Sequence, residues 1–106
     1  MTLTKQIGKR TKIDVDSNKI IRHESKITGL ELYLSEDRSG ISAKVSLNGF
    51  NDRSYSIRRW SSLDQPREEY LKQARREYQE ILKKFRNGEY KIDVYGDGKV
   101  EVTLLD

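Results

Sequence analysis

Alternating apolar and polar residues dominate the middle of the chain. Residues 29–35 carry leucine at every second position, residues 41–47 are apolar at odd numbers, and a third alternating run covers 53–60. Side chains of a strand point alternately to the two faces of a sheet. Asn48 and Gly49 both tolerate positive φ and predict a hairpin turn. The pattern therefore predicts a three-stranded antiparallel sheet with one apolar face and one polar, basic face.

The next segment changes to helical periodicity. Asp64 suits the N-cap, Pro66 suits the first turn, and Asn87-Gly88 favours a left-handed end. One apolar stripe recurs at helical spacing, and its members are Tyr70, Leu71, Ala74, Tyr78, Ile81, Leu82 and Phe85. We expect one long amphipathic helix that covers the apolar face of the sheet.

Shorter patterns flank this core. Residues 12–15 and 19–22 predict a small N-terminal hairpin, and residues 90–95 and 99–104 predict a C-terminal one, because both arms alternate around turn residues. The C-terminal hairpin either extends the first sheet or forms a second layer over the helix. Residues 1–10 are polar and basic without clear periodicity, and we expect them to form a flexible basic arm.

These elements predict an α+β fold: a three-stranded antiparallel sheet packed on one long helix, with flanking N- and C-terminal β-hairpins. We expect a single domain over 11–106 with its core at 29–88. With 34% hydrophobic and 36% charged residues among 106, the core must be thin, and a deep enclosed pocket is not expected. The chain has no cysteine, which excludes disulfides and thiol chemistry.

No apolar run is long enough to cross a bilayer, and the N-terminal residues lack the apolar core of a secretory signal. We therefore expect a cytoplasmic protein without membrane contact. The formal net charge is +4. Residues 1–26 carry seven Lys or Arg against three Asp or Glu, residues 63–88 seven against five, and residues 89–106 only two against five. This excess of positive charge favours anionic partners. The acidic last segment, residues 89–106, is not expected to contact them.

The inventory of reactive side chains does not favour an enzyme. His23 is the only histidine and lies between Arg22 and Glu24, a solvated setting that does not suit a Ser-His-Asp relay. Asp14 and Asp16 could bind magnesium, but turn chemistry explains them more simply. The acidic residues around the last hairpin are explained as solubilising charge. We expect no catalysis, no cofactor and no metal site.

The polar face of the sheet is the candidate binding surface. If the apolar positions face the helix, strand alternation puts these residues on the other face: Glu31, Tyr33, Ser42, Lys44, Ser46, Ser54, Ser56, Arg58 and Trp60. Two strands of a twisted sheet can enter the DNA major groove, where small serines allow close approach and arginine binds guanine or phosphate. The alternative is an ordinary solvated face, with Trp60 as a cap over the core.

A resemblance strengthens the first interpretation. Residues 29–86, with "SGISAKVSLNGFNDRSYSIRRW" ahead of "REEYLKQARREYQEI", resemble the AP2-type DNA-binding domain and the arm-binding domain of phage tyrosine recombinases. In those families a three-stranded sheet lies in the major groove and the helix braces it. The resemblance implies that Lys44, Arg58 and Trp60 contact bases, and that Arg38 and Arg53 contact the DNA from the turns. Arg59 flanks the third strand and joins the predicted nucleic-acid-binding set.

The sequence thus predicts a small non-enzymatic protein that binds double-stranded DNA through the outer face of its sheet, encoded by a phage or mobile element. The alternative is a protein-binding module, such as a phage-encoded inhibitor of a host complex. Alternating charges and edge strands suit that role. A third interpretation is a structural subunit that forms a homodimer through an edge strand or the helix stripe.

Overall fold

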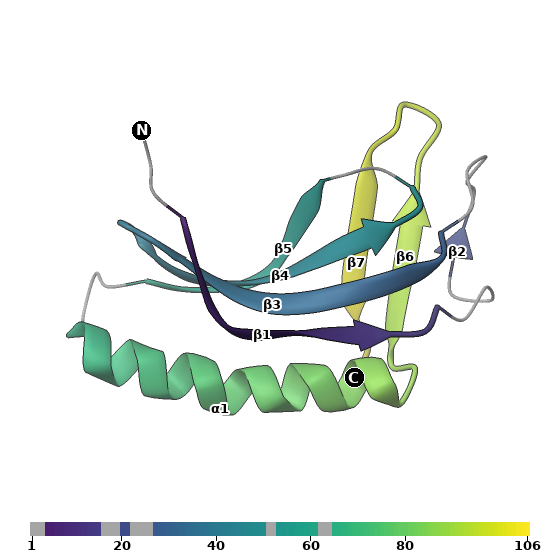
Figure 1. Cartoon of the computed structure of the whole chain (residues 1–106). Coiled ribbons are helices and arrows are strands. Elements are labelled where there is room, and N and C mark those ends of the chain that lie inside the picture. The colour runs from purple at the N-terminus through teal and green to yellow at the C-terminus, as the bar shows by residue number, and fades with distance from the viewer. Residues whose placement is uncertain (1–3, 16–19, 22–26, 51–52, 62–64) are drawn as a thin grey trace.

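The computed structural model describes residues 4–15, 20–21, 27–50, 53–61 and 65–106, and at 20–21 only the backbone is described. The fold is α+β, with one helix and two β-sheets (Figure 1). In chain order the elements are β1 (Lys5–Ile13), β2 (Ile20–Ile21), β3 (Gly29–Asp37), β4 (Gly40–Asn48), β5 (Ser54–Ser61), α1 (Arg67–Arg86), β6 (Tyr90–Val94) and β7 (Val100–Leu104).

The larger sheet, called sheet A here, is antiparallel and has the strand order β1-β3-β4-β5. Helix α1 lies along one side of it, and β3 is bowed so that its concave side faces away from the helix (Figure 1). The smaller sheet, sheet B, has the order β2-β6-β7. Its strands β6 and β7 run steeply across the direction of β3 and β4 (Figure 1).

The three predicted central strands are confirmed, but the sheet has a fourth strand. Leu30, Leu32 and Leu34 of β3 pair with Leu47, Val45 and Ala43 of β4, and all six side chains are buried on the helix side. The tight β3–β4 turn depends on Gly40, whose φ of 146° is unfavourable for other residues. A Cβ atom at Gly40 would also clash with the Trp60 carbonyl oxygen.

The predictions for the N-terminal region are wrong. Residues 5–10, predicted as part of a flexible arm, belong to β1, the edge strand that pairs with β3. Residues 12–13 pair with β3 and residues 20–21 pair parallel to β6, so the predicted N-terminal hairpin does not form. The physical reason is a bulge in β1: the register shifts between Ile7 and Thr11, which hides the alternation that would have marked a strand.

The helix is confirmed with a later start. Pro66 occupies the N-cap position, and Asp64, the predicted cap, lies outside the described residues. The apolar stripe is buried as predicted except for Leu71, which is half-buried. Gly88 has a φ of 74° and donates its backbone N–H to the Phe85 carbonyl, which gives the predicted left-handed end.

The C-terminal hairpin is confirmed and forms a second sheet. Its Tyr90, Ile92 and Val94 side chains are buried in the same hydrophobic core as the stripe of α1. The Phe85 and Tyr90 rings stack with their centroids 4.7 Å apart. Sheet B therefore closes the end of the core where α1 ends, and leaves the outer surface of α1 uncovered by any described element (Figure 1).

Candidate nucleic-acid interface

The outer face of sheet A, the face away from α1, contains only part of the predicted set. Lys44 lies there, opposite Tyr33 and Ser56, and is half-buried. Arg38 is exposed in the β3–β4 turn, and Arg53 is exposed before β5. The structure does not bring these three cations together with Arg58 and Trp60.

The predicted placement of Arg58 and Trp60 is wrong because β5 contains a bulge. Lys44 pairs with Ser56, but Ala43 pairs with Arg58, so one extra residue shifts the alternation. Arg58 and Trp60 consequently point to the helix side. Trp60 is only 5% exposed, which confirms its alternative interpretation as a cap over the core.

Glu77 of α1 holds both displaced side chains. Its carboxylate accepts hydrogen bonds from Trp60 Nε1 at 3.1 Å and from Arg58 Nη1 at 3.0 Å. Burial raises the pKa of Glu77, but hydrogen bonds from Gln73, Trp60 and Arg58 and the Arg58 charge outweigh it and keep the pKa below its ordinary value of 4.5. This contact fixes α1 to β5 and neutralises Arg58.

Replacement of this carboxylate tests its structural role. Because the pKa of Glu77 is lower in the folded protein, its stabilising contribution is complete above the unfolded value of 4.5 and is lost as pH falls through the folded value. We expect Glu77→Gln to reduce the free energy of unfolding by about 1 kcal/mol at pH 7, with allowance for solvent screening. Urea unfolding should show a smaller difference between wild type and variant at pH 3, and an equal difference at both pH values would contradict this role.

Arg59 does lie on the outer face, but its charge is compensated. Its guanidinium donates to Asp37 at 3.2 Å and to Ser42 at 3.0 Å, and it also contacts Ser39. Hydrogen bonds from Ser39, followed by the Arg59 charge, lower the pKa of Asp37. Asp37 therefore remains ionised beside Arg59 at neutral pH.

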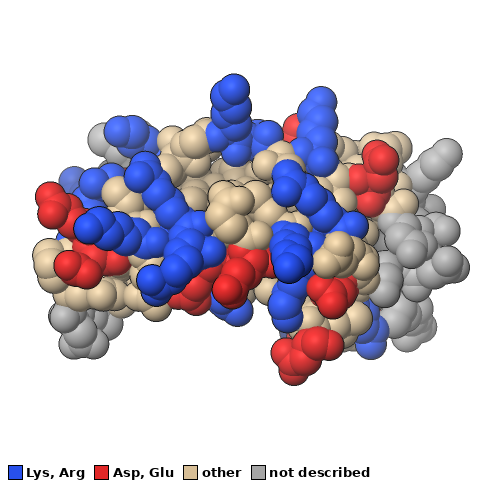
Figure 2. Space-filling model, turned by 90° about the horizontal axis from the view of Figure 1, so that it is seen from below, with Lys and Arg blue, Asp and Glu red and all other residues tan. Residues whose placement is uncertain are grey.

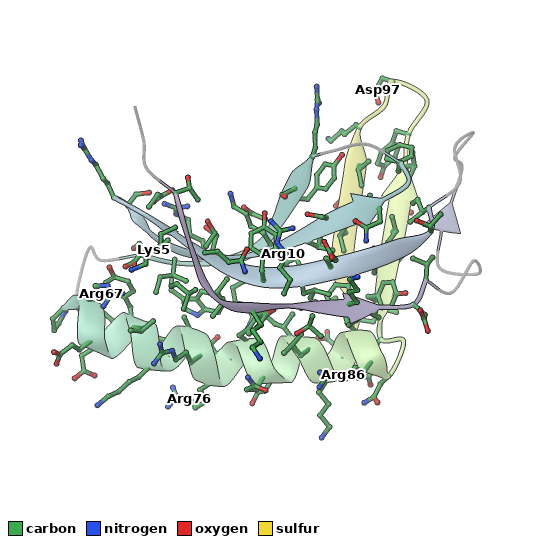
Figure 3. All side chains as sticks on the ribbon, viewed as in Figure 1. Lys5, Arg10, Arg67, Arg76, Arg86 and Asp97 are labelled. Atoms are coloured by element: carbon green, nitrogen blue, oxygen red, sulfur yellow. The ribbon has the colours of Figure 1, made fainter. Side chains whose placement is uncertain are left out.

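A second arginine of this face is also paired. Arg10 of β1 lies on the side of sheet A opposite α1 (Figure 3), with its guanidinium carbon 4.1 Å from the centre of the Tyr33 ring and Nη1 3.4 Å from Glu31. Tyr33 and Ser35 are buried on this concave face. Two cations of this concave face, Arg10 and Arg59, are therefore paired with carboxylates, whereas Lys44 and Arg38 have no ion pair with a described carboxylate.

A larger group of cations without a described ion pair lies on the other side of the molecule. The β1–α1 basic surface, as we name it, consists of seven exposed side chains without an ion-pair partner among the described residues: Lys9, Lys12, Lys72, Arg75, Arg76, Lys83 and Arg86. The five from α1 recur at helical spacing on the face opposite the buried stripe. Arg76 projects from α1 away from sheet A (Figure 3), whereas Arg86 lies with Lys12 of β1 around a hollow near the end of α1.

Lys and Arg side chains are prominent on this surface. Figure 2 shows many of them over this face, with Asp and Glu side chains between and beside them. Of the acidic side chains of α1, Glu77 accepts hydrogen bonds from Arg58 and Trp60 of β5. At the start of α1, Arg67 binds Glu36 through two bonds of 2.7 and 2.9 Å and is not part of the β1–α1 basic surface.

The surface is hollowed where β1 meets α1. One hollow of about 510 Å³ has Lys9, Thr11, Arg75, Arg76, Tyr78 and Gln79 among its lining residues. A second, of about 440 Å³, has Lys12, Asp14 and Arg86 near the end of α1. Both hollows therefore open beside unpaired cations.

Comparisons with protein-family models, with curated proteins and with solved structures found no match. Among the described residues, no helix is long and apolar enough to cross a membrane. The same part of the chain contains no group of three or more His, Cys, Asp or Glu arranged to hold a metal ion. Asp16 and His23 lie outside the described residues.

Sequence reasoning missed the β1–α1 basic surface although two signals for it were present. The basic excess of residues 1–26 and 63–88 coincides with β1 and α1. The cations of α1 also share one face at helical spacing. What the sequence did not show is that Lys9 and Lys12 belong to a strand beside that helix.

Proposed function

We propose that this protein binds nucleic acid, and duplex DNA in particular, through the β1–α1 basic surface. The observation that carries the proposal is the set of seven exposed cations that form no ion pair with a described carboxylate. Unpaired surface cations bind phosphates with release of condensed counterions, which is the main source of sequence-independent affinity. The exposed arginines of α1 can also form two-pronged hydrogen bonds to phosphate oxygens.

The dimensions of the surface suit a duplex. Lys72 and Arg86 are fourteen positions apart on α1, which corresponds to about 21 Å at 1.5 Å per residue. Duplex DNA carries about twelve phosphate charges over that length of its axis. The duplex therefore offers enough phosphates for each cation of the row to contact one.

The expected mode is contact with the sugar-phosphate backbone, without enzymatic activity. Phosphate contacts position a protein on DNA, whereas sequence is recognised at base edges. The resemblance to AP2-type and arm-binding domains supports DNA as the ligand but implies recognition by the sheet face. The pairing of Arg58 with Glu77 and of Arg59 with Asp37, and the burial of Trp60, favour the opposite side of the molecule.

The test is binding of a fluorescein-labelled, random-sequence duplex measured by anisotropy over a salt series. We expect the association constant to fall steeply with salt, with a log–log slope of about −0.9 for each phosphate neutralised and a limit of about −6 for seven cations. No binding at low salt, or a slope near zero, would contradict the proposal. In that case an acidic protein surface, the partner of the inhibitor hypothesis, becomes the better candidate.

A further inference from the structure

The hydroxyl of Tyr78 is unsatisfied in the interior of the protein. Tyr78 is 7% exposed, and its hydroxyl is buried without a hydrogen-bond acceptor among the described residues. Burial raises the pKa of Tyr78 to about 12, an effect that hydrogen bonding from the nearby Thr11 side chain and the Arg86 charge only partly offset. At neutral pH the group therefore remains a protonated phenol and keeps its capacity to donate. Buried polar groups normally have a partner, so this exception requires an explanation.

Tyr78 lies at the larger hollow between β1 and α1. Of the lining residues, Lys9, Arg75 and Arg76 are cationic, Thr11 and Gln79 are polar, and none is a carboxylate. The register of β1 shifts beside the hollow, between Ile7 and Thr11; Gly8 has a φ of 74°, and no atom would contact a Cβ at that position. The result is a recess lined by cations and by Tyr78, whose buried hydroxyl has no acceptor among the described residues.

We infer that this hollow binds one phosphate group. The hydrogen-bond donors to the phosphate are the Tyr78 hydroxyl and the side chains of Lys9, Arg75 and Arg76. This inference rests on the proposed function, which it deepens by assigning a backbone phosphate to a particular recess. A phosphate has several acceptor oxygens and a negative charge, and it matches a site that offers donors and cations without competing carboxylates. A diester of nucleic acid and free phosphate share this chemistry.

The experiment compares wild type with Tyr78→Phe, using inorganic phosphate and a random-sequence duplex as separate probes. Phosphate binding is followed by nitrogen-15 NMR shifts of residues 8–12 and 75–79, and duplex binding by anisotropy. The matched control is Tyr70→Phe, which removes the hydroxyl of another buried tyrosine on α1 that does not line the hollow.

We expect Tyr78→Phe to bind inorganic phosphate about tenfold more weakly and the duplex several-fold more weakly, the effect of one hydrogen bond to a charged group. Its thermal midpoint in phosphate-free buffer should equal or exceed that of wild type, because an unsatisfied hydroxyl has been removed. Tyr70→Phe should leave both affinities unchanged. Arg75→Gln supplies a second variant at an exposed position and should weaken phosphate binding by a similar factor.

The outcomes separate the two proposals. If wild type shows no phosphate-dependent shifts at the hollow, or Tyr78→Phe binds phosphate and duplex as wild type does, the inference is wrong. If the duplex binds wild type and Tyr78→Phe equally, the proposed function stands and the inference fails. If inorganic phosphate binds at the hollow and is lost in the variant while no duplex binds, the inference holds for free phosphate and the proposed function fails.

Discussion

The double substitution Arg75→Glu with Arg76→Glu is expected to weaken duplex DNA binding by about a hundredfold or more. Both side chains are exposed on α1, line the larger hollow and have no ion pair with a described residue. Their reversal removes two charge-assisted contacts, each worth about 1.5–3 kcal/mol, and adds repulsion from the phosphates. Anisotropy with a random-sequence duplex at low salt measures the change.

The matched control reverses two charges on the other side of the molecule. Arg38→Glu with Lys44→Glu changes the net charge by the same amount but acts on the outer face of sheet A and its turn. We expect this variant to bind within about fivefold of wild type, because charges that lie farther from the bound duplex than the Debye length are largely screened at moderate salt. A larger loss in the control than in the helix variant would assign DNA binding to the sheet face instead.

Phe85→Ala is expected to reduce the free energy of unfolding by about 3–5 kcal/mol. Phe85 is 1% exposed and stacks on Tyr90, so its ring joins the last turn of α1 to sheet B. Its removal leaves a cavity at the junction of helix and both sheets, where the surroundings cannot fully collapse. Small domains have a total stability of about 5–15 kcal/mol, so chemical denaturation will show the loss clearly.

Two variants define the baseline for that measurement. Lys83→Ala changes an exposed residue two positions before Phe85 and should alter the free energy of unfolding by less than about 0.5 kcal/mol. Phe85→Leu keeps most of the apolar volume and should cost less than the alanine variant. A loss below about 1 kcal/mol for Phe85→Ala would contradict the role of the stack with Tyr90.

Local patterns were sufficient wherever strand or helix periodicity was unbroken. The alternation at 41–47, the stripe of α1 and the two arms of the C-terminal hairpin all led to the observed elements. The failures occurred at bulges. One extra residue near Ile57 turned Arg58 and Trp60 to the helix side, and the irregular register after Ile7 concealed β1. A bulge is fixed by the partner strand, and the sequence of one strand does not show it.

The candidate site was recoverable only in part. The sequence showed where positive charge is concentrated along the chain, but not which charges are compensated. Arg58 and Glu77 are nineteen positions apart, and Arg59 and Asp37 twenty-two, so these pairs depend on tertiary contacts. The same is true of the approach of Lys9 to Arg75 and Arg76 across the hollow. Strand alternation correctly predicted that Lys44 lies on the outer face. The pairing of Arg59 with Asp37, in contrast, depends on the folded structure.

The most direct test of the account is chemical-shift mapping of the nitrogen-15-labelled protein during titration with a random-sequence duplex at low salt. We expect the largest shift changes at residues 9–12 of β1 and 72–86 of α1, and only small changes at Lys44 and Ser56 on the outer face of sheet A. Changes concentrated on β4 and β5, or no changes at any duplex concentration, would contradict binding through the β1–α1 basic surface.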